Sequence, residues 1–98
     1  MMLPGMDGLL GQARKLQEEL KKETVEFSAG GGMVRAVASG RMEIVSLRIE
    51  REIVNPDDVE MLQDVITAAV NGALGKAREA VREKMSATMG FDIGTLMG

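Results

Sequence analysis

The first predicted element is an amphipathic helix with one narrow apolar stripe. The stripe consists of five residues at alternating spacings of three and four: Met6, Leu9, Ala13, Leu16 and Leu20. Residues such as Gln, Arg, Lys and Glu lie between them, so the pattern is close to a coiled-coil seam. A lone helix of this length is only marginally stable in water, and a second copy of the chain is the natural surface for it to pack against.

The middle of the chain predicts three antiparallel strands. Apolar and polar residues alternate from Thr24 to Ser28, and further strands are expected over Met33–Ala38 and Met42–Ile53. On the third strand the apolar residues expected on one face are Val45, Leu47 and Ile49. Short turns between the strands then predict a meander with one buried face.

Glycine residues mark the turns between these strands. Gly30, Gly31 and Gly32 suit a hairpin turn that needs positive φ, and Ser39–Arg41 predicts a second tight turn. A phosphate-binding loop is the alternative for the glycine run. Such loops lead into a helix, whereas these glycines lead into a strand, so the sequence favours the hairpin.

A second, longer helix follows the strands. Asn55 is a suitable N-cap, Pro56 suits the first helical position, and Asp57 and Asp58 suit the first turn. An alanine-rich stripe then runs from Val59 to Val81, and the helix is expected to fray near Thr88. The fold class is therefore α+β in the order helix, three strands, helix. We expect a single domain over residues 1–98, with a core of about 6–90 and a short tail at 91–98.

The composition excludes most kinds of catalytic site. The chain has no His, Cys, Trp or Tyr, which excludes Ser/His triads, thiolate nucleophiles and zinc fingers. The acids Asp57, Asp58, Glu60 and Asp64 lack EF-hand spacing, and the helix dipole explains the first two. We therefore expect no enzyme activity, no cofactor and no bound metal.

Hydropathy argues for a cytoplasmic protein. No apolar run approaches the roughly 20 residues that a membrane span needs. Residues 1–8 lack the basic and apolar regions of a signal peptide. We therefore expect no membrane partner.

Charge is distributed unevenly along the chain. The formal net charge is −3, but cations concentrate within residues 12–22 and 75–84, and acids concentrate within residues 50–64. Such basic clusters are usually solvated helix faces, and contact with nucleic acid is the alternative. The charge pattern alone leaves both interpretations open.

Several segments occur in a distinctive order. They are Gly-Leu-Leu-Gly-Gln-Ala-Arg-Lys-Leu-Gln-Glu-Glu-Leu (8–20), Gly-Gly-Met-Val-Arg-Ala (31–36), the turn at Gly40, Ile-Val-Ser-Leu-Arg-Ile (44–49), and Asp-Val-Glu-Met-Leu-Gln-Asp-Val-Ile-Thr-Ala-Ala-Val-Asn (58–71). Together with a Met-rich tail after Lys84, this order resembles the YbaB/EbfC family of bacterial nucleoid-associated proteins. The resemblance covers roughly residues 6–90.

The resemblance implies a tweezer-shaped homodimer with protruding helices that binds DNA in the nucleoid and affects chromosome organisation or gene expression. DNA contact in the family is attributed to the first helix and to the helical segment near the C-terminus. The matching cations here are Arg14, Lys15, Lys21, Lys22, Lys76, Arg78, Arg82 and Lys84. The apolar stripe expected to support dimerisation contains Leu62, Ile66, Ala69, Val70 and Ala73.

The expected binding mode is contact of Lys and Arg with the backbone of double-stranded DNA. This mode predicts low sequence specificity and strong salt dependence. The alternative is a protein–protein adaptor linked to DNA repair or replication that does not contact DNA. The net negative charge and the Met-rich tail motivate that alternative.

Overall fold

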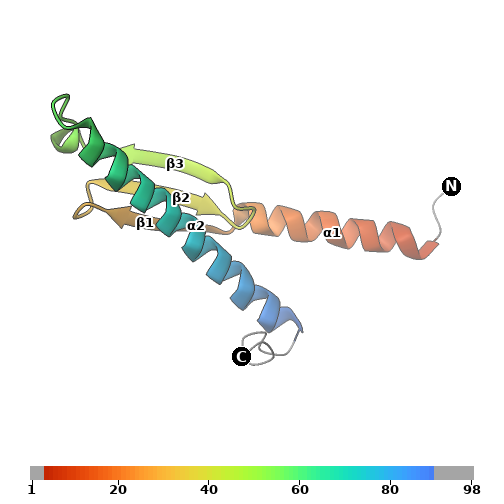
Figure 1. Cartoon of the computed structure of the whole chain (residues 1–98). Helices are drawn as coiled ribbons and strands as arrows, with labels where there is room; N and C mark the ends of the chain where they lie inside the picture. Colours follow the sequence, from red (N-terminus) through yellow and green to blue (C-terminus); the bar gives the residue numbers. More distant parts are fainter. Residues whose placement is uncertain (1–3, 90–98) are drawn as a thin grey trace.

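A computed structural model of the chain describes residues 4–89, with side chains described over residues 8–87. The fold has the predicted α+β order of one helix, three strands and a second helix (Figure 1). The elements are α1 (Pro4–Lys22), β1 (Thr24–Ala29), β2 (Val34–Ser39), β3 (Ile44–Ile49), the 3-10 turn η1 (Arg51–Ile53) and α2 (Val59–Met89). The tail expected at 91–98 lies outside the described residues.

The three strands form an antiparallel sheet in the order β1-β2-β3. The glycine run forms the turn between β1 and β2, as predicted. Gly30, Gly31 and Gly32 all have positive φ, at 63°, 67° and 89°. A Cβ at Gly30 would lie 2.8 Å from Val65 Cγ1, so the turn also needs glycine because α2 passes close to it.

The third strand is shorter than the sequence pattern predicted. β3 ends at Ile49, and the chain then turns through η1, where the N–H of Ile53 donates to the Glu50 carbonyl at 3.2 Å. This turn packs Ile53 against the core. Alternation alone does not reveal it, because Ile53 is apolar in either conformation.

The predicted face of the third strand was also partly wrong. Val37 pairs with Ser46 and Ala38 pairs with Ile44, so β3 contains an extra residue at this point. Such a bulge shifts the alternation of side chains by one residue. Ile44 therefore shares the α2-facing side of the sheet with Leu47 and Ile49, in place of the predicted Val45.

The start of the second helix differs from the prediction as well. The Asn55 side chain accepts from the N–H of Asp57 at 3.0 Å, which forms a turn before the helix. Asp58 Oδ1 accepts from the N–H of Met61 at 3.2 Å. Asp58 is thus the capping residue, and α2 begins at Val59 and not at Pro56.

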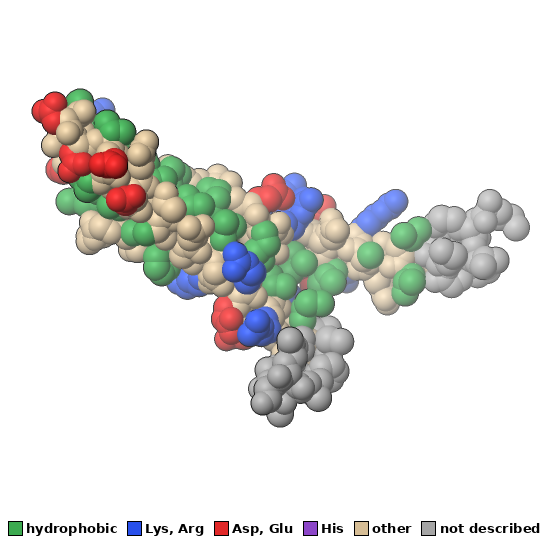
Figure 2. All heavy atoms as spheres, in the orientation of Figure 1, with side chains coloured by type: hydrophobic (Ala, Val, Ile, Leu, Met, Phe, Trp, Pro, Cys, Tyr) green, Lys and Arg blue, Asp and Glu red, His purple; other side chains and the backbone are tan. Residues whose placement is uncertain are grey.

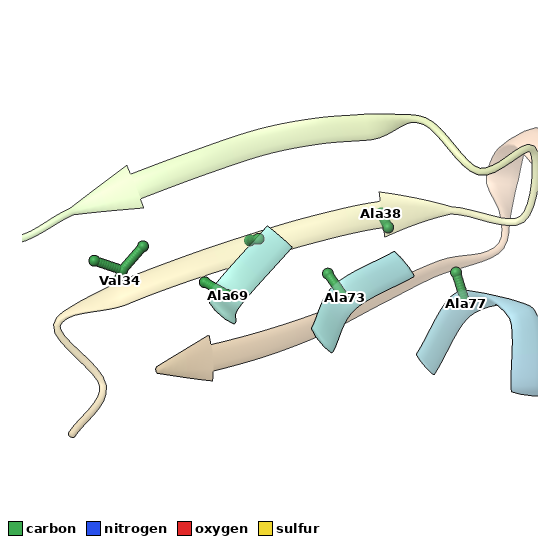
Figure 3. Packing of buried hydrophobic residues seen from close by; sticks show 6 residues of the cluster. Val34, Ala38, Ala69, Ala73 and Ala77 are labelled. Carbon is green, nitrogen blue, oxygen red and sulfur yellow. The ribbon is translucent and has the colours of Figure 1, made fainter. Parts of the chain in front are cut away.

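The core is small and consists mainly of alanine. Its fully buried members are Val34, Ala36, Ala38, Ala69, Ala73 and Ala77, each at most 1% exposed. Figure 3 shows the alanines of α2 directed at β2. Short side chains allow close approach of the helix to the sheet. α2 contacts mainly β1 and β2 and leaves most of β3 uncovered.

The first helix projects away from the sheet (Figure 1). It is attached at its C-terminal end, where the N–H of Gly40 donates to the carbonyls of Leu20 at 2.9 Å and Glu23 at 2.8 Å. The apolar stripe of α1 stays in contact with solvent, since Leu9 is 67% exposed and Leu16 is 39% exposed. Among the described residues, no helix is long and apolar enough to span a membrane.

Candidate nucleic-acid interface

The cations of α1 that are expected to contact DNA share one side of the helix. An α-helix turns by about 100° per residue, so they fall on roughly a third of its circumference. The four are Arg14, Lys15, Lys21 and Lys22, and all are exposed. This arc lies opposite the apolar stripe that contains Leu9 and Leu16. The helix therefore presents a basic face and an apolar face in opposite directions.

The cations of α2 that are expected to contact DNA point in three directions. Arg78 and Arg82 lie opposite the line of buried alanines and face solvent. Lys76 lies on the flank over β1, where its Nζ donates to the Glu26 carbonyl oxygen at 2.9 Å. An ammonium group has three donors, so two N–H bonds of Lys76 remain for other acceptors.

Lys84 connects the two helices. It lies on the same side of α2 as the buried alanines, at a point beyond the sheet. Its Nζ lies 3.5 Å from Glu23 Oε2 and 4.0 Å from Glu19 Oε2. Both carboxylates belong to the segment where α1 ends. The contact brings the C-terminal half of α2 beside the base of α1. The two carboxylates already offset the positive charge of Lys84.

Acidic residues of the chain offset little of the charge of the other cations that are expected to contact DNA. Arg82 lies 3.9 Å from Glu79, one turn away on the same helix. Within the described residues, six of the eight make no ion pair, and five of these six also make no side-chain hydrogen bond: Arg14, Lys15, Lys21, Lys22 and Arg78. These five are therefore available to an external anion.

Acidic residues gather at the other end of the molecule. Figure 2 shows most of the acidic side chains of this face at the end where α2 begins, away from α1. Asp57, Asp58 and Glu60 are all exposed there. Over the described residues, no three acids come together in a way that could hold a metal ion. Although the net charge is −3, acidic residues concentrate at the end where α2 begins, and the cations described above lie on α1 and the C-terminal half of α2.

An apolar strip lies between α2 and β3. Leu62, Ile66 and Val70 on α2 are half-buried, and Ile44 and Leu47 on β3 are 38% and 42% exposed. We call these five residues the α2–β3 strip.

Two residues predicted for the dimer interface belong to the core of the single chain. Ala69 and Ala73 are fully buried against the chain's own sheet.

Comparison with known sequences assigns the chain to a protein family. Residues 2–91 match the YbaB/EbfC DNA-binding family. The chain belongs to that family. The match confirms the resemblance seen in the sequence, and it covers nearly the whole chain. The matching family is a DNA-binding family and not an enzyme family.

Individual relatives in the YbaB/EbfC family are similar over most of their length. A nucleoid-associated protein of Desulforamulus reducens is 54% identical, covering 92% of both chains. One of Moorella thermoacetica is 48% identical, covering 91% of this chain and 86% of the relative. The solved structure of uncharacterized protein HP0035 from Helicobacter pylori has a TM-score of 0.65 at 27% identity, covering 86% of this chain and 96% of that one.

Sequence reasoning missed two groups of residues beside this interface. Glu19 and Glu23 hold Lys84, but Glu23 and Lys84 are 61 positions apart and no local pattern joins them. Ile44 joined the strip only because of the bulge in β3. In hindsight, the apolar pair Ile44-Val45 was a signal, since it interrupts strict alternation.

Proposed function

We propose that this YbaB/EbfC chain binds double-stranded DNA as a homodimer with low sequence specificity. The observation that carries the proposal is the set of five exposed cations on the two helices that make neither an ion pair nor a side-chain hydrogen bond among the described residues. Membership of a DNA-binding family supplies the class of anion that they bind.

The chemistry of these side chains supports contact with phosphates. Lys and Arg on exposed helix faces pair with backbone phosphates, and such contacts carry no sequence information. The chain has only two aromatic residues, which disfavours stacking on single-stranded bases. Duplex binding of this kind releases counterions, so its affinity falls steeply as salt is added.

The α2–β3 strip supports the homodimer. It exposes apolar side chains along two neighbouring elements, and burying them against a second copy would remove that area from water. A two-fold axis would also bring together two copies of each basic segment. Four basic helical segments then act on one duplex, which offsets the acidic total charge.

The names of the relatives support a role in the nucleoid. Similar proteins of several bacteria are named nucleoid-associated proteins. By analogy, we propose that this chain acts in the nucleoid and affects chromosome organisation or gene expression.

The DNA-binding proposal is tested by titrating a labelled duplex with protein at several salt concentrations. The logarithm of the association constant is expected to fall linearly with the logarithm of salt concentration. Lys22→Gln is expected to weaken binding by about three- to tenfold, because it removes a phosphate contact. Arg51→Gln is the control, since it makes the same charge change between Glu50 and Glu52 at the acidic end.

Absence of duplex binding at low salt would overturn the proposal. Salt-independent binding would also overturn it, since it would exclude phosphates as the main contact. Recovery of a protein partner after nuclease treatment, without duplex binding, would favour the protein–protein adaptor.

The homodimer is tested by size-exclusion chromatography with light scattering. Leu47→Asp places a charge within the α2–β3 strip and is expected to shift the mass from two chains to one. Val54→Asp is the matched control, because Val54 is 52% exposed in the loop before α2 and outside the strip. A wild-type mass of one chain at all concentrations would contradict the homodimer.

A further inference from the structure

We propose that the sheet face turned away from α2 also binds the phosphate backbone of duplex DNA, through Arg35 and Arg48. This inference rests on the proposed DNA-binding function and extends its surface to a face that the helices do not provide.

The two arginines lie side by side on neighbouring strands. Arg35 of β2 pairs directly with Arg48 of β3. On β2, Arg35 lies between Val34 and Ala36, which are buried toward α2, so its side chain points to the opposite face. Residues opposite each other in this way have Cβ atoms about 5 Å apart. Two guanidinium groups are thus presented together to solvent.

This pair is unfavourable within the isolated chain. Like charges directly opposite on two strands repel each other. Arg35 has one compensating contact, 3.9 Å from Glu26 Oε1, between side chains that are each more than half exposed. Arg48 makes no ion pair among the described residues. An external anion between the two arginines would relieve this repulsion.

The chemistry of the face identifies a phosphodiester as that anion. Guanidinium groups bind phosphate oxygens with two parallel hydrogen bonds. Ser28 and Ser46 are exposed on the same face, and serine hydroxyls also donate to phosphates. Val37 is an apolar residue at the centre of this face, and it is half-buried between its neighbours.

The arginine pair is continuous with the cations of α2. Lys76 Nζ donates to the Glu26 carbonyl oxygen at the edge of β1, and the Glu26 carboxylate contacts Arg35. Arg35 in turn lies opposite Arg48. Three cations therefore follow one another from Lys76 on α2 around the edge of β1 to Arg35 and Arg48, with the Glu26 carboxylate between Lys76 and Arg35. A duplex held at Lys76 would reach the arginine pair by crossing the edge of β1.

The test compares duplex affinity and thermal stability for Arg35→Gln/Arg48→Gln, with Arg51→Gln as the control of equal charge change per site. We expect the double variant to bind about tenfold more weakly, and the slope of log affinity against log salt to fall by about 1 for each phosphate that the variant no longer neutralises. Its melting temperature is expected to rise, because the repulsion is removed. Arg35→Lys/Arg48→Lys, which keeps both charges, is expected to retain most of the affinity and the salt slope.

Unchanged affinity and slope in the double variant, with normal binding by wild type, would overturn this inference and leave the proposed function intact. Failure of wild type itself to bind the duplex would overturn the proposed function. A lower melting temperature in the double variant would contradict the argument from repulsion. Arg48→Gln alone, on the edge strand, then separates an effect on folding from an effect on phosphate binding: full affinity in a folded single variant would overturn the role of Arg48.

Discussion

At the scale of single residues, Gly40 fixes the point where α1 meets the sheet. Its N–H donates to two carbonyls at the end of α1, those of Leu20 and Glu23. A Cβ at this position would lie 2.7 Å from the Leu20 carbonyl oxygen. Backbone cannot swing aside as a flexible side chain can, so any larger residue must displace the helix. The direction in which α1 projects therefore depends in part on this glycine.

Gly40→Ala is expected to lower the free energy of unfolding by about 2 kcal/mol, because the clash is with backbone. Urea denaturation followed by circular dichroism measures it. Gly11→Ala is the control: a Cβ there meets nothing within 4 Å, and alanine is the better helix former by about 1 kcal/mol. The two substitutions are expected to change the free energy of unfolding in opposite directions, and a stabilising Gly40→Ala would contradict the close backbone contact at Gly40.

At the scale of elements, Lys84 links α2 to the base of α1. The contact contributes little to folding, since partly exposed ion pairs are worth about 0–1 kcal/mol. Its consequence is positional, because it brings the end of α1 beside the C-terminal half of α2. Lys84 also differs from the other cations of the interface, because two carboxylates contact it.

Lys84→Gln is expected to weaken duplex binding by less than about twofold, whereas Lys22→Gln weakens it by about three- to tenfold. The reason is that Glu19 and Glu23 already offset the charge of Lys84. Fluorescence anisotropy with one labelled duplex at one salt concentration compares the two variants directly. An equal or larger effect of Lys84→Gln would mean that the carboxylates release Lys84 to DNA.

The elements themselves were largely predictable from hydrophobic periodicity. Alternation placed β1 and β2 within one residue of their observed positions, and the glycine run marked the hairpin between them. The errors lie at element ends. The start of α2 depends on which of Asn55 and Asp58 caps it, and β3 ends where η1 packs Ile53 on the core. Both outcomes depend on local hydrogen bonds or distant packing, which the periodicity does not contain.

At the scale of the whole molecule, the described fold is extended. Its radius of gyration is 18.2 Å, whereas a compact chain of this length has about 13 Å. The excess comes from α1, which projects from the sheet, and from the end of α2 beyond it (Figure 1). An extended chain leaves its apolar stripes in water, and both α1 and the α2–β3 strip are such surfaces. A second copy is the partner that this shape favours.

The candidate interface could be predicted only in part. The basic segments of both helices were visible because their residues are close in sequence. Pairings between distant residues were not visible: Lys84 with Glu23, and Arg35 opposite Arg48. The alanine line on α2 was also ambiguous, because the same stripe suits a dimer or the chain's own sheet. The structure places Ala69 and Ala73 against the sheet.

In the proposed complex, two chains together present enough basic surface to hold one duplex despite a net charge of −3 on each. Sedimentation velocity of a short labelled duplex, with increasing protein at low salt, measures the number of chains in the first complex. We expect two chains per duplex at the lowest protein concentration that gives binding. A first complex with one chain, at the same affinity, would contradict binding as a dimer.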